Sequence, residues 1–150
     1  MLTVYKASAG SGKTFTLTYE YIKLLLGEKD ENGAYRLNKT GRDCHRSILA
    51  ITFTNKATAE MKRRIVQELA VLAEVESVKD SAKSPYTERL ISELNCSQEE
   101  LKQAADKALQ ELLFDFNFFN ISTIDSFFQN VLRVFAREAE LTGNYEVELN

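Results

Sequence analysis

Eight consecutive residues near the start of the chain have the types and spacing of a loop that binds phosphate: Ala7, Ser8, Ala9, Gly10, Ser11, Gly12, Lys13 and Thr14. They fit the P-loop pattern GxxxxGKS/T, except that alanine replaces the first glycine. The two glycines allow a tight turn that directs backbone N–H groups at phosphate oxygens. Lys13 can hold the β- and γ-phosphates, and the Thr14 hydroxyl can bind Mg²⁺. These residue types predict a nucleoside triphosphate site.

Such a loop needs a strand before it and a helix after it. Three β-rich runs, each followed by a helical pattern, are Leu2–Lys6, Ile48–Phe53 and Phe119–Ile124. We predict helices from Lys13 to Leu26 with Gly27 as a C-cap, from Asn55 to about Glu74, and from about Asp125. Strand–helix repetition of this kind predicts an α/β fold, with a parallel sheet flanked by helices.

Two segments interrupt this alternation. Residues 28–46 are polar and contain two glycines, so we predict a long surface loop. Residues 75–115 carry two helical signals: Ser84-Pro85 starts a short helix, and the capping box Ser97–Glu100 opens a longer one. We therefore predict a helical insertion over 75–115. The α/β core then comprises residues 1–74 and 116–150.

The composition is that of one globular domain, with 150 residues, 44% hydrophobic and 27% charged. Two cysteines, Cys44 and Cys96, and the single His45 are too few for a zinc module, a disulfide scaffold or an enzyme that needs two histidines. The apolar runs are far shorter than the ~18 residues of a membrane helix, and no signal peptide is apparent. We expect a cytoplasmic protein without membrane contact.

The charge is unevenly distributed along the chain. The net charge is −3, yet residues 1–73 carry 12 basic and 7 acidic side chains, whereas residues 74–115 carry 5 basic and 10 acidic. An asymmetric chain can present a basic face to a polyanion. A solvated charge pattern without a partner is the other interpretation, and composition alone leaves both open.

Three segments resemble motifs of the UvrD/Rep-type superfamily 1 DNA helicases. The first is the phosphate loop with its helix, and its Ala-Ser-Ala-Gly spelling is similar to the RecB-like branch, the beta subunit of exonuclease V. The second, Ile48–Ile65, reads ILAITFTNKATAEMKRRI and is similar to family motif Ia almost residue for residue. The third, Asn120–Gln129, reads NISTIDSFFQ and resembles the motif TxHSF, with Asp125 where histidine is common.

The resemblance implies an ATP-dependent DNA helicase of the P-loop NTPase (RecA-like) fold, within a helicase–exonuclease of DNA break repair or recombination. ATP and Mg²⁺ are the implied cofactors, Lys13 is the implied catalytic residue, and the implied partners are the remaining helicase domains and a further subunit. The second and third motifs would face single-stranded DNA or a duplex end. The residues implied are Phe53, Thr54, Asn55, Lys56, Thr123, Ser126 and Phe127. Their chemistry agrees, because an aromatic ring can stack on a base and a helix N-terminus can bind phosphate.

Several of these residues also have structural interpretations. Phe53 is either a stacking surface or a core aromatic, and Thr54 or Asn55 caps the helix with or without binding DNA. For Asp125, whose charge would repel a phosphate, we predict an N-cap role. We predict core packing for the four phenylalanines between 114 and 119. A basic group either lines the DNA path or forms a solvated face: Lys56, Lys62, Arg63 and Arg64.

The chain also departs from the family in what it lacks. It has no Walker B Asp-Glu pair; Leu112–Asp115 is a superficial candidate, but helical periodicity continues there and we predict a helix. The later motifs, including the arginine finger, are missing. We therefore expect the N-terminal piece of a longer protein, inactive by itself in ATP hydrolysis. Two other classes stay open: a P-loop small-molecule kinase and a non-hydrolysing nucleotide-binding module.

Overall fold

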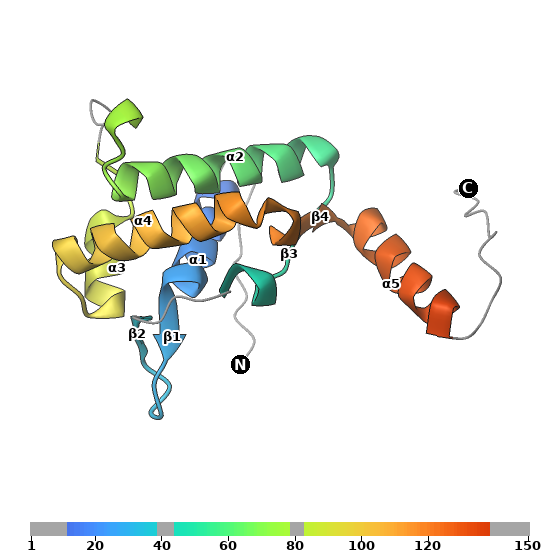
Figure 1. The fold of residues 1–150 in the computed structure, drawn as a ribbon, viewed down its shortest axis with the longest axis horizontal. Helices are drawn as coiled ribbons and strands as arrows, with labels where there is room; N and C mark the ends of the chain where they lie inside the picture. Colours follow the sequence, from blue (N-terminus) through green and yellow to red (C-terminus); the bar gives the residue numbers. More distant parts are fainter. Residues whose placement is uncertain (1–11, 39–43, 79–82, 139–150) are drawn as a thin grey trace.

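The computed structural model describes residues 12–38, 44–78 and 83–138 (Figure 1). The predicted first strand, Leu2–Lys6, and the loop residues Ala7–Ser11 lie outside this part of the chain. The helices are α1 (Lys13–Leu26), α2 (Asn55–Leu72), α3 (Thr87–Leu94), α4 (Gln98–Phe114) and α5 (Ile124–Glu138). The strands are β1 (Gly27–Lys29), β2 (Tyr35–Leu37), β3 (Ala50–Thr52) and β4 (Ile121–Thr123). Three short 3₁₀ turns cover Cys44–Ser47, Glu76–Val78 and Phe116–Phe118.

The helices follow the sequence pattern closely. The prediction for α1 is confirmed at both ends, whereas α2 ends at Leu72, two residues before the predicted end, and α5 begins at Ile124, one residue before the predicted start. The two helices predicted between 75 and 115 are also present as α3 and α4. The capping box of α4 is complete: Glu100 N–H donates to Ser97 Oγ (3.2 Å), and Ser97 N–H donates to the Glu100 carboxylate (2.9 Å).

The core lies between helices α1 to α4. One face of α2 is buried, because its apolar residues follow the i, i+4, i+8, i+11 spacing of a single stripe: Met61, Ile65, Leu69 and Leu72. The matching stripe of α4 is Leu101, Ala105, Ala108 and Leu112. The two helices lie side by side and both contact α1 (Figure 1). The predicted division into an α/β core and an insertion remains a prediction, since α3 and α4 share this core.

A small parallel sheet carries the strands of the second and third motifs. β3 pairs with β4 in the register Ala50↔Ile121, Ile51↔Ser122 and Thr52↔Thr123. Ile121 and Thr123 are buried, whereas Ile51, on the alternate side of the pleat, is half exposed. The chain is therefore a helix-rich α/β protein, with a parallel sheet of two short strands among the described residues.

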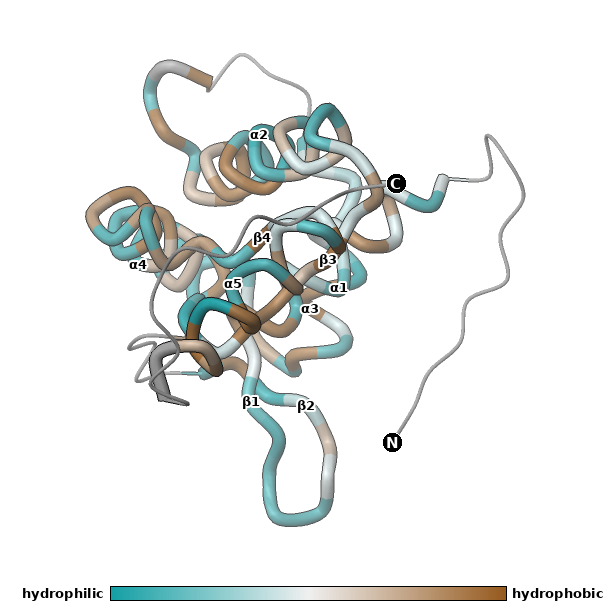
Figure 2. The backbone as a smooth tube through the Cα atoms, turned by 90° about the vertical axis from the view of Figure 1, so that its right-hand side faces the viewer, coloured by the Kyte–Doolittle hydropathy of each residue, from teal (hydrophilic) through white to brown (hydrophobic). Residues whose placement is uncertain are grey.

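The prediction of a loop over residues 28–46 is wrong in part. β1 and β2 form an antiparallel hairpin, which projects from the helices and is largely hydrophilic (Figure 2). Its turn is held by Asp30 Oδ1, which accepts hydrogen bonds from the N–H groups of Asn32 and Ala34 (both 2.9 Å), and Gly33 provides the positive φ of 79°.

Gly27 joins α1 to this hairpin. Its N–H donates to the Lys23 carbonyl as the predicted C-cap would, but its backbone is extended (φ −114°, ψ 155°) rather than left-handed. The absence of a side chain matters for space, since a Cβ here would lie 2.7 Å from Leu94 Cδ2 and 2.7 Å from the Lys23 carbonyl oxygen. The strand and α3 approach too closely for any larger residue.

Candidate nucleotide and nucleic-acid site

The predicted phosphate loop ends at the N-terminus of α1. Gly12 has the left-handed conformation φ 79°, ψ 23°, and α1 begins at the next residue. Lys13 and Thr14 occupy the first turn and are exposed, and that turn contains no acidic side chain. The positive end of a helix with an exposed lysine and hydroxyl fits a polyphosphate and its Mg²⁺. The other five loop residues, Ala7–Ser11, lie outside the described residues.

The two DNA-motif segments meet at one edge of the sheet. Because β3 and β4 are parallel and Thr52 pairs with Thr123, both strands end at the same edge. Each strand is followed by the N-terminus of a helix, α2 after β3 and α5 after β4. The seven predicted DNA-contacting residues lie at or soon after these two strand ends, although Thr123 is buried there: Phe53, Thr54, Asn55, Lys56, Thr123, Ser126 and Phe127. We call this surface the strand-end edge.

Both helices at this edge are capped by a threonine. Thr54 Oγ1 accepts a hydrogen bond from Ala57 N–H (3.1 Å), so the capping role predicted for Thr54 or Asn55 is confirmed for Thr54. Thr123 Oγ1 accepts one from Ser126 N–H (3.2 Å) and donates to Ser126 Oγ (2.9 Å). The predicted N-cap role of Asp125 is therefore wrong. α5 begins at Ile124, and Asp125 lies inside its first turn, where its negative charge interacts favourably with the helix dipole.

The Thr123 cap has a signal in the sequence. Threonine is a preferred N-cap residue, and Thr123 stands where the predicted strand passes into the helix. The resemblance to the motif TxHSF draws attention to Asp125 as the cap instead, because Asp125 stands in the place of the histidine. At the other junction, Thr52 Oγ1 donates to the Thr54 carbonyl (3.2 Å) and lies 2.6 Å from Thr58 Oγ1, which ties the strand end to the first turn of α2.

The aromatic residues divide differently from the predictions. Phe53 has 85% of its surface exposed, so the core interpretation is wrong for it. Core packing is also wrong for Phe114, which is 95% exposed, and Phe116 and Phe118 are about half exposed. Only Phe119 of that group is buried, 5.6 Å from the ring of Tyr21. Phe114 points outward because it lies two residues beyond Leu112, which is on the buried stripe of α4.

The basic residues of α2 have different surroundings. Arg63 and Arg64 both bind the carboxylate of Glu60 (2.9 and 3.0 Å), and these contacts keep the pKa of Glu60 below its usual range. Lys62 lies 5.4 Å from the rings of Phe116 and Phe119, and burial lowers its pKa. Lys56, in the first turn of α2, is exposed at the strand-end edge.

Asp115 does not have the environment of a Walker B carboxylate. It follows a continuous helix, α4, rather than a strand, which confirms the helical prediction for this segment. Its carboxylate forms an ion pair with Arg46, whose Nε lies 2.8 Å from Oδ2, and the buried His45 Nε2 lies 3.5 Å away. These contacts hold the 3₁₀ turn Cys44–Ser47 against the end of α4 and give Asp115 a structural role.

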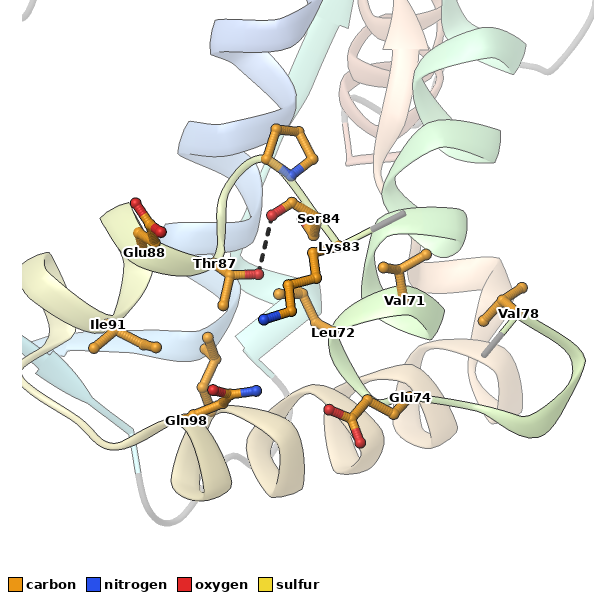
Figure 3. A pocket seen from close by; sticks show the side chains of 12 residues that line it. Val71, Leu72, Glu74, Val78, Lys83, Ser84, Thr87, Glu88, Ile91 and Gln98 are labelled. Atoms are coloured by element: carbon orange, nitrogen blue, oxygen red, sulfur yellow. Dashed lines mark hydrogen bonds between the residues drawn. The ribbon is translucent and has the colours of Figure 1, made fainter. Parts of the chain in front are cut away.

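Two pockets among the described residues are open to solvent. One, of about 670 Å³, lies beside β4 and α5 and includes Phe127 of the strand-end edge. The other, of about 650 Å³, lies between the end of α2, α3 and α4, with Lys83, Glu74 and Gln98 around it (Figure 3). None of the predicted site residues lines this second pocket.

The described residues contain neither a membrane span nor a metal cluster. Within residues 12–38, 44–78 and 83–138, no helix is long and apolar enough to cross a membrane. In the same ranges, no three side chains of histidine, cysteine, aspartate or glutamate gather in a way that could hold a metal ion.

A glycine in the left-handed conformation before an exposed helix N-terminus, together with a parallel strand pair, is typical of nucleotide-binding α/β proteins. The family model described as the UvrD/REP helicase N-terminal domain matches residues 2–149. The chain belongs to this family. The family implies a P-loop NTPase fold, and the described residues form a helix-rich α/β structure with a small parallel sheet.

Several curated proteins are similar to the chain. The RecBCD enzyme subunit RecB of Buchnera aphidicola subsp. Schizaphis graminum is 32% identical over 128 residues, 85% of this chain and 10% of that protein. A subunit of the ATP-dependent helicase/nuclease of Lactobacillus gasseri is 30% identical over 141 residues, 94% of this chain and 8% of that protein. The ATP-dependent DNA helicase PcrA of Staphylococcus aureus is 45% identical over 69 residues, 46% of this chain and 8% of that protein. The chain thus spans a tenth or less of the length of these relatives.

Proposed function

We propose that this chain is the ATP- and single-stranded-DNA-binding part of an ATP-dependent DNA helicase, in a helicase–exonuclease of DNA break repair or recombination. The observation that carries the proposal is the strand-end edge, where two parallel strands place an exposed aromatic ring and two helix N-termini side by side. An aromatic ring and helix N-termini are the groups that hold bases and phosphates of a single strand. The names of the similar proteins, which include RecB, a helicase/nuclease and PcrA, support the same function.

In this proposal the nucleotide binds at residues 7–14 and the DNA at the strand-end edge. Lys13 neutralises the β- and γ-phosphates, Thr14 supplies a hydroxyl to Mg²⁺, and the N-terminus of α1 adds its dipole. The metal contributes charge stabilisation of the transferred phosphoryl group when it is bound. Further helicase domains and a partner subunit would complete the enzyme, which we expect to act in the cytoplasm.

The test is ATP turnover by the full-length protein, measured with and without oligothymidine. The proposal expects single-stranded DNA to stimulate ATP hydrolysis. Phosphate transfer to a small acceptor, without any effect of DNA, would instead identify a kinase. Nucleotide binding without turnover in either condition would identify a binding module and would contradict the proposal.

Substitutions of Thr54 separate helix capping from DNA binding. Thr54→Asp keeps a good N-cap for α2, so we expect thermal stability close to that of the wild type. The added negative charge lies at the proposed phosphate contact, so affinity for labelled oligothymidine should fall roughly tenfold, about 1.4 kcal/mol. Thr54→Ser is the matched control that keeps both roles. If Thr54→Asp binds DNA as well as Thr54→Ser does, Thr54 only caps the helix.

A further inference from the structure

Tyr86 connects the segment between the second and third motifs to the helix of the phosphate loop. It lies one residue before α3, and its hydroxyl donates a hydrogen bond to the carbonyl oxygen of Phe15 (3.2 Å), 71 residues earlier in the chain. Its ring centroid is 4.6 Å from that of Phe15 and 5.8 Å from that of Tyr19. Phe15 directly follows Thr14, so Tyr86 contacts the turn of α1 that carries the loop's lysine and hydroxyl.

The turn that carries Tyr86 is also attached to α2. Ser84 Oγ donates to the carboxylate of Glu68 on α2 (2.7 Å), and Tyr86 N–H donates to the same hydroxyl (3.3 Å). Thr87 closes the turn, with its Oγ1 (3.0 Å) and its N–H (3.2 Å) both donating to the Ser84 carbonyl. Residues 84–87 therefore form a rigid bridge from α2 to the first turn of α1.

Because Tyr86 is buried, its hydrogen bond to Phe15 restricts where the first turn of α1 can lie. Tyr86 has only 2% of its surface exposed, and burial is the main reason that its pKa is raised, so the hydroxyl stays a donor. A buried hydroxyl without a partner is unfavourable, and here the partner is a carbonyl in the first helical turn. A shift of that turn along the helix axis would break the bond and separate the two rings.

We propose that Tyr86 is a positioning residue of the nucleotide site, which holds the first turn of α1, and with it Lys13 and Thr14, in place relative to α2. The inference rests on the proposed function, since it assigns the role through the phosphate loop. The segment between the second and third motifs would then position the nucleotide site as well as connect the two motifs.

The test compares Tyr86→Phe with Tyr21→Phe in the full-length protein. Tyr86→Phe keeps the ring and removes the hydroxyl, and with it the hydrogen bond to Phe15. Tyr21 is a matched control, since it is also a buried tyrosine of this core and its hydroxyl has no hydrogen-bond partner among the described residues. We expect Tyr86→Phe to raise KM for ATP by roughly 2- to 10-fold, the range of one hydrogen bond, and Tyr21→Phe to leave it unchanged. KM for the DNA cofactor at saturating ATP should change less than KM for ATP.

Two outcomes are decisive against the inference. Unchanged KM for ATP in Tyr86→Phe, or an equal change in Tyr21→Phe, would show that Tyr86 only stabilises the core, with melting temperature as its sole readout. Lys13→Ala is measured in parallel to distinguish this from failure of the proposed function. If Lys13→Ala binds and hydrolyses ATP normally, residues 7–14 are not the nucleotide site. Tyr86 then has no nucleotide site to position.

Discussion

Lys13→Ala in the full-length protein is expected to lower ATP turnover by about 10²–10³-fold, the range found when one preorganised group that stabilises transition-state charge is removed. Lys13 is the first residue of α1 and follows the left-handed Gly12, so its side chain leaves the loop where the phosphates are expected. Alanine removes that charge without altering the backbone. The measurements are ATP turnover and the Kd for a fluorescent ATP analogue.

Folding should be almost unaffected by this substitution, because Lys13 is exposed and alanine is a better helix former. Lys107→Ala is a suitable control, since it removes another exposed lysine from a helix, α4, outside the proposed sites. We expect its ATP turnover and melting temperature to equal those of the wild type. A large fall in the melting temperature of Lys13→Ala alone would mean that Lys13 is a structural residue.

The regular elements can be predicted because their signals are local. The apolar stripe of α2 and the capping box of α4 depend on residues at most eleven positions apart, and both occur as expected. The hairpin of β1 and β2 escapes prediction because its strands are only three residues long, too short for an alternation such as Tyr35-Arg36-Leu37 to stand out. The Asn32-Gly33 pair at its turn is the available signal.

The sequence proposes the residue types of the candidate site but only part of its geometry. Motif spacing identifies Phe53, Thr54 and Thr123, but a sequence pattern does not state that Thr52 and Thr123 are paired in register, which is what joins the two motifs. The exposure of each aromatic ring is equally hard to predict. Phe53 and Phe119 both stand at one end of a predicted strand, yet Phe53 is exposed and Phe119 is buried. Tyr86 has no local signal, because its partner is 71 residues away.

Phe53→Ala should weaken binding of single-stranded DNA, and the loss should be independent of salt. A base stacked on an aromatic ring contributes about 1–3 kcal/mol, so we expect the Kd for oligothymidine to rise roughly 5- to 150-fold. The ring is 85% exposed, so its removal should hardly change the melting temperature. Phe114→Ala is the matched control, because this ring is 95% exposed at the end of α4, which precedes β4 rather than following it.

Salt dependence separates stacking from phosphate contact at the same edge. Phe53→Ala removes no charge, so the slope of log Kd against log salt concentration should equal that of the wild type. Lys56→Ala, three residues further along, should weaken binding less at high salt than at low salt and reduce the slope by about one. If Phe114→Ala lowers affinity as much as Phe53→Ala does, binding depends on exposed aromatic surface in general. The strand-end edge would then not be the DNA site, and the parallel register of β3 and β4 would serve folding alone.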